Sequence, residues 1–292
     1  MLHISLKQNG YWLSIGSFVF AAALLLSGCT SLSSDDQVTV LSFNIRYDNP
    51  GDGIDAWPNR SEWVASIIVN SGASIIGLQE ALQSQLMDIS SGAPQFAYVG
   101  VGRDDGKAAG EFSPILYDST LWKIDSWETR WLSETPSEVG VAGWDAALPR
   151  IATIVDFRNV FTGKPLRVIN THFDHRGEEA RLESAKLIAS WANEGKEAVV
   201  ILGDFNFEES DPPYAHIVSG NEADRLVDSA VLLGSNATPT FLGFDASNST
   251  GPRIDYVFCN QAMLPTAYET LSPSRDGRYP SDHAPVRVKL TF

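Results

Sequence analysis

Short apolar runs recur along the chain from residue 38 onward, and most of them have the length of a β-strand. Each run is rich in valine, isoleucine, leucine or phenylalanine, and turn-forming residues separate one run from the next, which favours strands over helices. We therefore predict strands at residues 38–45, 74–80, 113–118, 150–157, 165–173, 198–204, 253–259 and 286–292.

Two segments between these runs repeat apolar residues every three or four positions, the spacing of one helical face. They are residues 59–72 and 177–195, and each ends in glycine, a common residue just after a helix. Residues 159–165 carry a hairpin signal with Gly163 at its tip. Because strands meet both hairpins and helices, we predict mixed sheets with helices outside, in one domain over residues 38–292.

The first 28 residues differ from the rest of the chain. A basic residue precedes a long apolar run, which is typical of an export signal. The run ends in Leu-Ser-Gly-Cys at residues 26–29, which resembles the lipobox of bacterial lipoproteins and implies lipidation of Cys29. We expect a signal peptide over residues 1–28 and a polar tether over residues 29–37. Thr30 favours an outer-membrane lipoprotein facing the periplasm; an uncleaved membrane anchor is the alternative.

The composition limits the partners. The formal net charge is −15, and no cluster of four or more Lys or Arg interrupts the acidic surface. Such a surface is repelled by duplex nucleic acid, so the sequence shows no obvious nucleic-acid grip. If Cys29 carries lipid, Cys259 has no partner, and we expect it to be a small core residue in a chain without an intrachain disulfide. We expect a monomer.

Carboxylate, amide and imidazole side chains lie at or near the ends of many of the predicted strands. One such residue is usually a turn former, but their recurrence indicates that several strand ends meet in one cleft. The residues are Asn44, Glu80, His172 with Asp174, Asp204 with Asn206, Asp255, and Asp282 with His283.

These residue types suit phosphoryl transfer with a hard metal ion. Oxygen ligands from Glu80, Asp282 and the Asn44 amide fit Mg²⁺ or Mn²⁺, whereas no cysteine cluster supports zinc. Asp204 could orient and deprotonate the attacking water, and Asn206 could hold that water or a phosphoryl oxygen.

Imidazoles can supply the remaining hydrogen bonds. His172 and His283 can donate to the nonbridging phosphoryl oxygens, and each needs a carboxylate behind it to fix its tautomer.

The motifs SFN, LQE, NTH, GDFN, IDY and SDH occur in this order between residues 38 and 292. Together they resemble the endonuclease/exonuclease/phosphatase superfamily, which includes deoxyribonuclease I, apurinic endonucleases, bacterial sphingomyelinases and inositol polyphosphate 5-phosphatases. The resemblance implies a four-layered α/β sandwich, with two mixed β-sheets face to face and helices outside. It also implies metal-dependent hydrolysis of phosphoester or phosphodiester bonds.

The resemblance assigns further roles by position. Glu80 matches the principal metal carboxylate, with Asn44 beside it and Asp282 near the metal. His283 would contact the phosphate and be oriented by Asp255. Asp204 would orient the nucleophilic water, Asn206 would bind phosphate, and His172 would bind it too, with Glu111 as a less specific carboxylate partner.

Segments around residues 100–117, 131–150 and 171–181 are similar to a bacterial group within the superfamily. This places Arg103 and Arg150 near the phosphate or its substituent. The alternative is that both form structural ion pairs with Asp104, Asp105 or Asp174.

The leading hypothesis is a metal-dependent hydrolase in the cell envelope that acts on a small phosphorylated compound or a lipid headgroup. The alternatives are an endonuclease or exonuclease of DNA or RNA, and a non-catalytic envelope binding module, although a degenerate module would be expected to lack a catalytic residue. A membrane-inserting hairpin at residues 125–131 would favour a lipid substrate, but alternation of Trp127, Thr129 and Trp131 is more typical of a half-buried strand.

Overall fold

The computed structural model describes residues 36–195, 198–220, 225–235 and 238–292. The expected signal peptide, the lipidation site Cys29 and most of the expected tether lie outside these residues. The first strand begins at Gln37, one residue before the predicted start. No helix in the described part of the chain is both long enough and apolar enough to cross a membrane.

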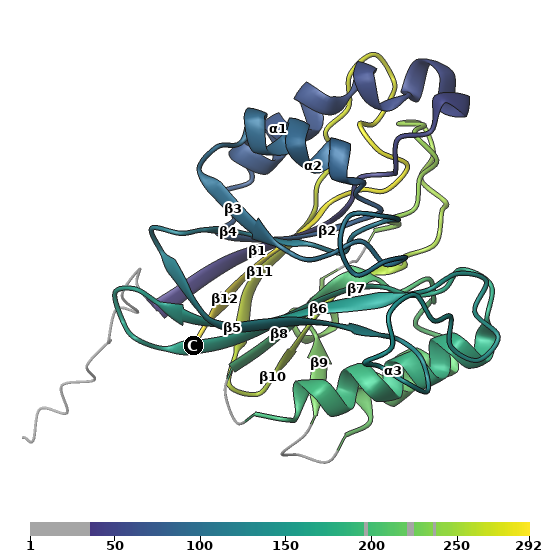
Figure 1. Ribbon diagram of the computed structural model, residues 1–292. Helices are drawn as coiled ribbons and strands as arrows, with labels where there is room; N and C mark the ends of the chain where they lie inside the picture. The colour runs from purple at the N-terminus through teal and green to yellow at the C-terminus, as the bar shows by residue number, and fades with distance from the viewer. Residues whose placement is uncertain (1–35, 196–197, 221–224, 236–237) are drawn as a thin grey trace, which may run out of the picture. The chain divides into compact units, whose positions relative to one another are not determined.

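Two six-stranded mixed sheets form the centre of the fold (Figure 1). The strands of sheet 1, in spatial order, are β11 (Leu264–Thr270), β12 (Val286–Thr291), β1 (Gln37–Asn44), β2 (Ile75–Gln79), β4 (Ile115–Asp118) and β3 (Phe96–Val99). Those of sheet 2 are β5 (Trp122–Trp131), β6 (Ile151–Asn159), β7 (Pro165–His172), β8 (Ala198–Asp204), β10 (Asp255–Asn260) and β9 (Leu226–Asp228).

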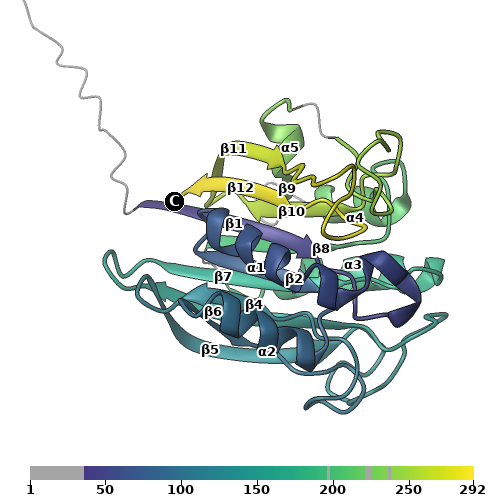
Figure 2. The same cartoon turned by 90° about the horizontal axis from the view of Figure 1, so that it is seen from above.

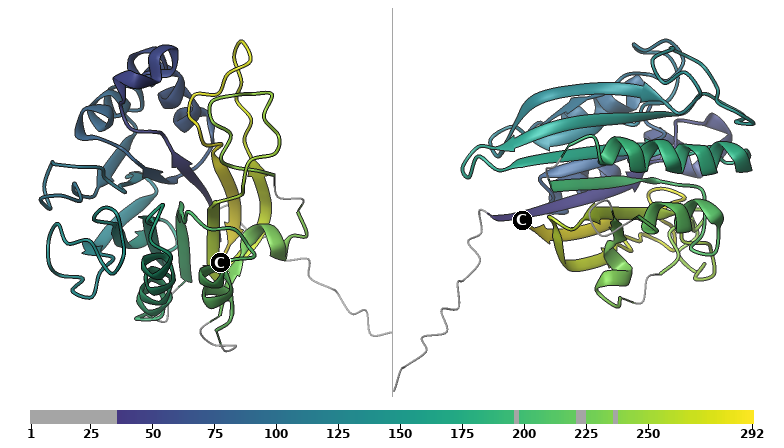
Figure 3. Two further views of the ribbon diagram at one scale, coloured as in Figure 1. Left: turned by 90° about the vertical axis from the view of Figure 1, so that its right-hand side faces the viewer. Right: turned by 90° about the horizontal axis from the view of Figure 1, so that it is seen from below.

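Helices cover the outer face of each sheet. Helices α1 (Ser61–Asn70) and α2 (Gln83–Gly92) lie over sheet 1, as Figure 2 shows from above. Helix α3 (Glu178–Ala192) lies over sheet 2, as the right-hand view of Figure 3 shows from below. Shorter elements complete the fold: the 3₁₀ helices η2 (Pro50–Asp55) and η3 (Trp57–Asn59), α4 (Pro212–Val218) and α5 (Ser229–Leu232). The predicted four-layered sandwich is confirmed.

Each sheet has one parallel pair near its centre: β1 with β2, and β7 with β8. The other paired strands are antiparallel. Parallel neighbours need a crossover connection, and α1 and α3 lie within these two connections. The two predicted helices are therefore the elements that make the parallel pairs possible.

Side-chain alternation along the central strands decides what faces the neighbouring sheet. In β1, Val38 and Val40 belong to the apolar layer between the sheets, and Asn44 has the same parity. In β8, Val200 and Leu202 belong to that layer, and Asp204 follows them. The polar strand ends therefore extend the inter-sheet layer at one edge.

A buried polar bridge joins the sheets beneath this edge. The Asn170 side chain donates to the backbone oxygens of Leu78 at 2.7 Å and Pro114 at 2.8 Å, and it accepts from Gln79 Nε2 at 2.7 Å. A Cβ on Gly77 would lie 2.6 Å from Asn170 Oδ1, so the bridge needs glycine at this position. These bonds fix the spacing of the sheets directly below the polar strand ends.

Two further expectations can be compared with the structure. Residues 125–131 lie within β5, whose end residues Trp122 and Trp131 are buried, so this segment is a strand. Cys259 is fully buried in the inter-sheet layer, and burial raises the pKa of its thiol to about 12.

Candidate active site

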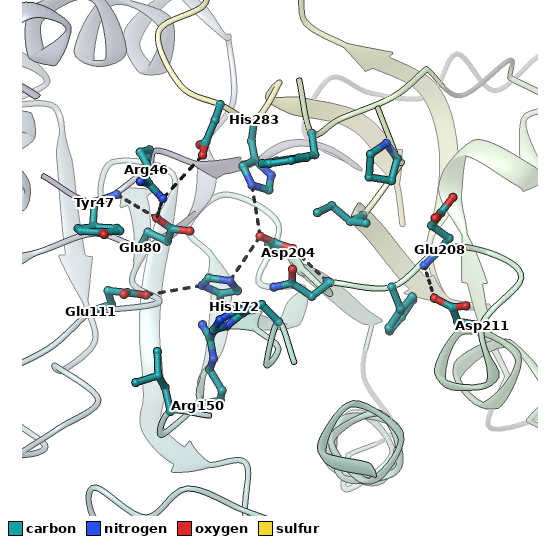
Figure 4. A pocket seen from close by; sticks show the side chains of 18 residues that line it. Arg46, Tyr47, Glu80, Glu111, Arg150, His172, Asp204, Glu208, Asp211 and His283 are labelled. Carbon is teal, nitrogen blue, oxygen red and sulfur yellow. Dashed lines mark hydrogen bonds and ion pairs between the residues drawn. The ribbon is translucent and has the colours of Figure 1, made fainter. Parts of the chain in front are cut away.

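A cavity of about 670 Å³ opens where β1, β2, β7 and β8 end (Figure 4). The predicted site residues that line it are Glu80, Glu111, Arg150, His172, Asp204, Asn206, Asp282 and His283. Three others, Asn44, Arg103 and Asp255, do not line the cavity and contact residues that do.

Strand register brings the sheet 2 residues together. His172 pairs with Asp204 across the parallel strands β7 and β8, and Asp255 pairs with Asp204 across β8 and β10. The three residues therefore form one row across neighbouring strands, although they are far apart in the sequence. His283 reaches the same row from the segment before β12.

Asn44 links the two sheets at the site. Its Nδ2 donates to Glu80 Oε1 at 3.1 Å and to Asp204 Oδ2 at 2.9 Å. Its Oδ1 accepts from the backbone N–H of Arg46 at 3.0 Å. The amide oxygen thus accepts one backbone hydrogen bond, and the Nδ2 group positions two carboxylates. The metal-ligand role of Asn44 stays a prediction.

Three residues of the cavity wall adopt positive φ without being glycine: Arg46 at 56°, Glu80 at 60° and Asn206 at 50°. Each follows within two residues of a strand end. Such conformations cost about 1–3 kcal/mol each and are maintained by surrounding contacts. For Glu80, one such contact is the bond from the Tyr47 N–H to Oε2 at 3.0 Å.

Glu80 and Asp282 present oxygen ligands on one wall of the cavity. Arg46 Nη1 lies 4.0 Å from Glu80 Oε2 and 3.9 Å from Asp282 Oδ2, beyond hydrogen-bonding distance from both. Burial raises the pKa of Asp282, and the charge of Glu80 raises it further. Two carboxylates that share one arginine at ion-pair distance, without a direct hydrogen bond to it, fit a hard divalent ion, which these two residues would hold.

Asp204, Asp255 and His283 also place potential ligand atoms within 4.8 Å of one another. However, His283 Nδ1 lies 2.8 Å from Asp255 Oδ2, so one imidazole nitrogen is already in a hydrogen bond. This group is better described as an acid–imidazole–acid chain, in which His283 Nε2 faces Asp204 Oδ2 at 3.6 Å.

The environment of His283 favours its charged form. Burial alone would lower the pKa of His283, but the carboxylates of Asp255 and Asp204 raise it well above its ordinary value. The predicted orienting role of Asp255 agrees with this geometry.

His172 has the opposite environment. Its Nε2 lies 3.4 Å from Asp204 Oδ2, while its Nδ1 is 3.8 Å from Glu111 Oε2 and forms no hydrogen bond. Burial lowers the pKa of His172 well below its ordinary value, and the charges of Arg150 and Arg103 act in the same direction. Glu111 is nearby, as predicted, but its closest partner is Arg103.

The two predicted arginines have different places. Arg103 forms a two-pronged ion pair with Glu111 at 2.7 and 2.9 Å and lies 3.9 Å from Asp104, one of its expected ion-pair partners. Its contact with substrate stays a prediction. Arg150 lines the cavity, pairs with Asp174 at 3.4 Å and contacts His175 Nδ1 at 3.0 Å. Its Nη1 is buried without a hydrogen-bond partner.

Sequence reasoning missed several residues of the cavity wall. Arg46 and His175 follow matched motif residues by two or three positions, and that proximity was the available signal. Glu208 likewise follows the motif residue Asn206 by two positions, whereas Asp211 and Phe241 lie farther from the motifs and carried no comparable signal.

The model of the endonuclease/exonuclease/phosphatase family matches residues 41–283. The chain belongs to this family. No curated protein gives a significant match.

Solved structures agree with this membership. An endonuclease/exonuclease/phosphatase family protein of Bacteroides thetaiotaomicron shares 35% identity, with a TM-score of 0.82 over 88% of this chain and 98% of that one. A mannosyl-6-phosphatase of the same organism shares 35% identity, with a TM-score of 0.81 over 87% of this chain and 100% of that one. A humanized zebrafish (D. rerio) TDP2, at 16% identity and a TM-score of 0.70 over 88% and 100% of the two chains, shows the shared fold alone.

Members of the endonuclease/exonuclease/phosphatase family hydrolyse phosphoester bonds, and this chain is a phosphoester hydrolase. Its cavity combines the groups that this reaction needs: a carboxylate between two imidazoles, an amide beside it and a pair of oxygen ligands.

Proposed function

We propose that the chain is a divalent-metal-dependent phosphatase of small phosphorylated compounds, with a sugar phosphate as the preferred class. The observation that carries this proposal is the convergence of Asp204, His172 and His283, with ring nitrogens 3.4 and 3.6 Å from the same carboxylate oxygen, next to Glu80 and Asp282. The 35% identity to a mannosyl-6-phosphatase, over that whole chain, supports the sugar-phosphate class.

In the proposed reaction, Asp204 orients a water molecule and accepts its proton as the water oxygen attacks phosphorus. Asn206 lies in the same loop as Asp204. Its Nδ2 group donates one hydrogen bond to the Phe173 backbone oxygen at 3.0 Å and keeps its second N–H for a phosphoryl oxygen. His283 and His172 donate to the other oxygens; the bond between phosphorus and the sugar oxygen breaks, and the departing alkoxide takes a proton from solvent to leave as the alcohol. Mg²⁺ or Mn²⁺ held by Glu80 and Asp282 would supply Lewis-acid stabilisation of the developing charge.

The test is a substrate panel with metal-stripped protein. We expect Mg²⁺ or Mn²⁺ to restore hydrolysis of p-nitrophenyl phosphate and of hexose 6-phosphates, and EDTA to abolish it. Glu80→Gln should lower kcat/KM by roughly 10²-fold or more, because it removes a ligand charge. Nicking of plasmid DNA at a higher kcat/KM than any phosphomonoester would overturn the proposal in favour of the nuclease alternative.

We also propose that the chain is exported and anchored as a lipoprotein through Cys29. Only the sequence of residues 1–29 supports this. Metabolic labelling with palmitate tests it: label that persists in a Cys29→Ser variant would refute the assigned attachment site.

A further inference from the structure

The cavity extends beyond the catalytic residues to a second wall. Four apolar residues and two carboxylates form this part, which we call the distal wall: Phe207, Phe241, Pro252, Ile254, Glu208 and Asp211. Figure 4 shows Glu208 and Asp211 on the opposite side of Asp204 from Glu80 and Glu111. The mechanism above uses none of these residues.

The two distal carboxylates are not committed to ion pairs. Within the described residues, neither Glu208 nor Asp211 has a cationic side chain within 4.0 Å. Asp211 Oδ2 accepts the backbone N–H of Glu208 at 2.9 Å, which fixes the loop and leaves its second oxygen available. The neighbouring Glu209 differs, because it pairs with Arg253 at 2.6 Å and does not line the cavity.

A second observation shows that the cavity is built for a ligand with an anionic group. Arg150 is 4% exposed, lines the same cavity, and its Nη1 has no hydrogen-bond partner. The Arg150 guanidinium places a positive charge at the cavity wall, and a phosphoryl group is a suitable counter-ion for it. The arginines of the cavity wall, Arg46 and Arg150, and the imidazoles of His172 and His283 lie at the part that also holds the catalytic carboxylates, whereas both charged residues of the distal wall are carboxylates.

The chemistry of the distal wall selects the kind of group attached to the phosphate. Carboxylate oxygens are acceptors, so they suit hydroxyl donors and repel a second phosphate. Phe241 is 39% exposed, and its ring packs at 5.1 Å against that of His283, so an apolar face stands next to the phosphate-handling residues. A pyranose offers hydroxyl groups at its edge and C–H groups on its face, whereas a nucleic acid would bring flanking phosphates towards the carboxylates.

We propose that Glu208 and Asp211 bind hydroxyl groups of the sugar in a monosaccharide phosphate, with Phe241 against the sugar face, and so determine specificity for sugar phosphates. This inference rests on the proposed phosphatase function and adds the residues that select the substrate.

The test compares two substrates that share the phosphate and differ in hydroxyl groups. Mannose 6-phosphate and p-nitrophenyl phosphate are assayed with wild type, Glu208→Gln, Asp211→Asn and the double variant. Both substitutions preserve side-chain shape, and Asp211→Asn retains an oxygen for the Glu208 N–H. Glu209→Gln is the matched control outside the cavity.

For mannose 6-phosphate we expect kcat/KM to fall roughly 10-fold in each single variant and about 100-fold in the double variant, mainly through KM. For p-nitrophenyl phosphate we expect kcat/KM to change by less than about twofold, because this substrate has no hydroxyl group for either carboxylate to bind. The control should match wild type with both substrates.

The outcomes separate the two proposals. If wild type hydrolyses both substrates and the double variant leaves mannose 6-phosphate turnover unchanged, the distal-wall inference is wrong and the phosphatase function stands. An equal loss on both substrates would indicate a structural effect and would also overturn the inference. If wild type hydrolyses neither phosphomonoester, the proposed function itself fails.

Discussion

Two loops at the active site, one from each sheet, have the same construction. After β1, Asn44 Oδ1 accepts the N–H of Arg46 at 3.0 Å; after β8, Asp204 Oδ1 accepts the N–H of Asn206 at 3.0 Å. The third residue of each loop has positive φ, 56° for Arg46 and 50° for Asn206. Each loop also follows a strand of its sheet's parallel pair. One backbone solution therefore serves both halves of the site.

The loops differ at one atom of their first side chain. Asn44 uses its second atom, an N–H₂ group, to donate to the carboxylates of Glu80 and Asp204. Asp204 uses its second atom, an oxygen, to face Asn44 and both imidazoles. The turn needs only one acceptor oxygen from its first side chain, so the second polar atom of that side chain can differ. In sheet 1 it is the Asn44 Nδ2 group, a hydrogen-bond donor, and in sheet 2 it is Asp204 Oδ2, the proposed proton acceptor.

The largest loss of activity is expected from Asp204→Asn, which gives the sheet 2 loop the same first side chain as the sheet 1 loop. Asp204→Asn retains the oxygen for the Asn206 N–H but replaces the proton acceptor with a donor that faces the Asn44 amide. We expect kcat for p-nitrophenyl phosphate to fall by roughly 10³-fold or more, while the fold persists. Steady-state kinetics with Mn²⁺ and thermal unfolding measure the two effects.

Asp245→Asn is a suitable control, because Asp245 makes the same kind of turn with the Ser247 N–H at 2.9 Å, is exposed and does not line the cavity. Its kinetics should match wild type. An Asp204→Asn enzyme that retains a tenth of wild-type kcat would show that this carboxylate is not the proton acceptor.

A smaller effect on catalysis is expected from the reciprocal change in sheet 1. Asn44→Asp keeps the acceptor for the Arg46 N–H but replaces two donated hydrogen bonds with a buried charge beside two carboxylates. We expect kcat to fall by roughly 10²-fold, and the free energy of unfolding of the metal-free protein to fall by about 3 kcal/mol. Urea unfolding in EDTA, alongside kinetics, measures both.

Added Mn²⁺ should recover part of the lost stability, because a cation offsets the extra charge. Wild-type stability and activity in Asn44→Asp would instead mean that the two bonds donated by Asn44 are dispensable, and that its positioning role is wrong.

The fold was largely predictable because the strand pattern is strong in the central strands. The run at residues 198–204 is apolar as far as Gly203 and Asp204 and is buried throughout. The run at residues 38–45 is mostly apolar, with Thr39 and Ser42 inside it, and is buried except at Thr39. The sequence pattern missed α2, where Leu86 and Ile89 are the buried aliphatic residues, and β11, where Pro265 alone is fully buried. Weakly apolar elements at the margin of a sheet depend on tertiary contacts that local periodicity does not show.

The sequence indicated which residues lie at the candidate site, but not which hydrogen bonds and ion pairs they form. Motif residues at strand ends gave Glu80, Asp204 and His283. The orientation of the Asn44 amide depends on a partner 160 positions away, and the pairing of Arg103 with Glu111 depends on how one loop folds back. Such contacts follow from three-dimensional packing, so sequence spacing cannot reveal them.

The direction of β1 has a consequence for how the domain can be attached to another body without covering the cavity. The described chain enters the domain at Asp36, where the Phe292 N–H donates to its backbone oxygen and Lys164 pairs with its carboxylate at 2.7 Å. The eight residues of β1 then carry the chain roughly 26 Å to the cavity rim. Any attachment made through the residues before Asp36 would therefore join the described domain one strand length from the cavity rim, and the cavity entrance would not be the point of attachment.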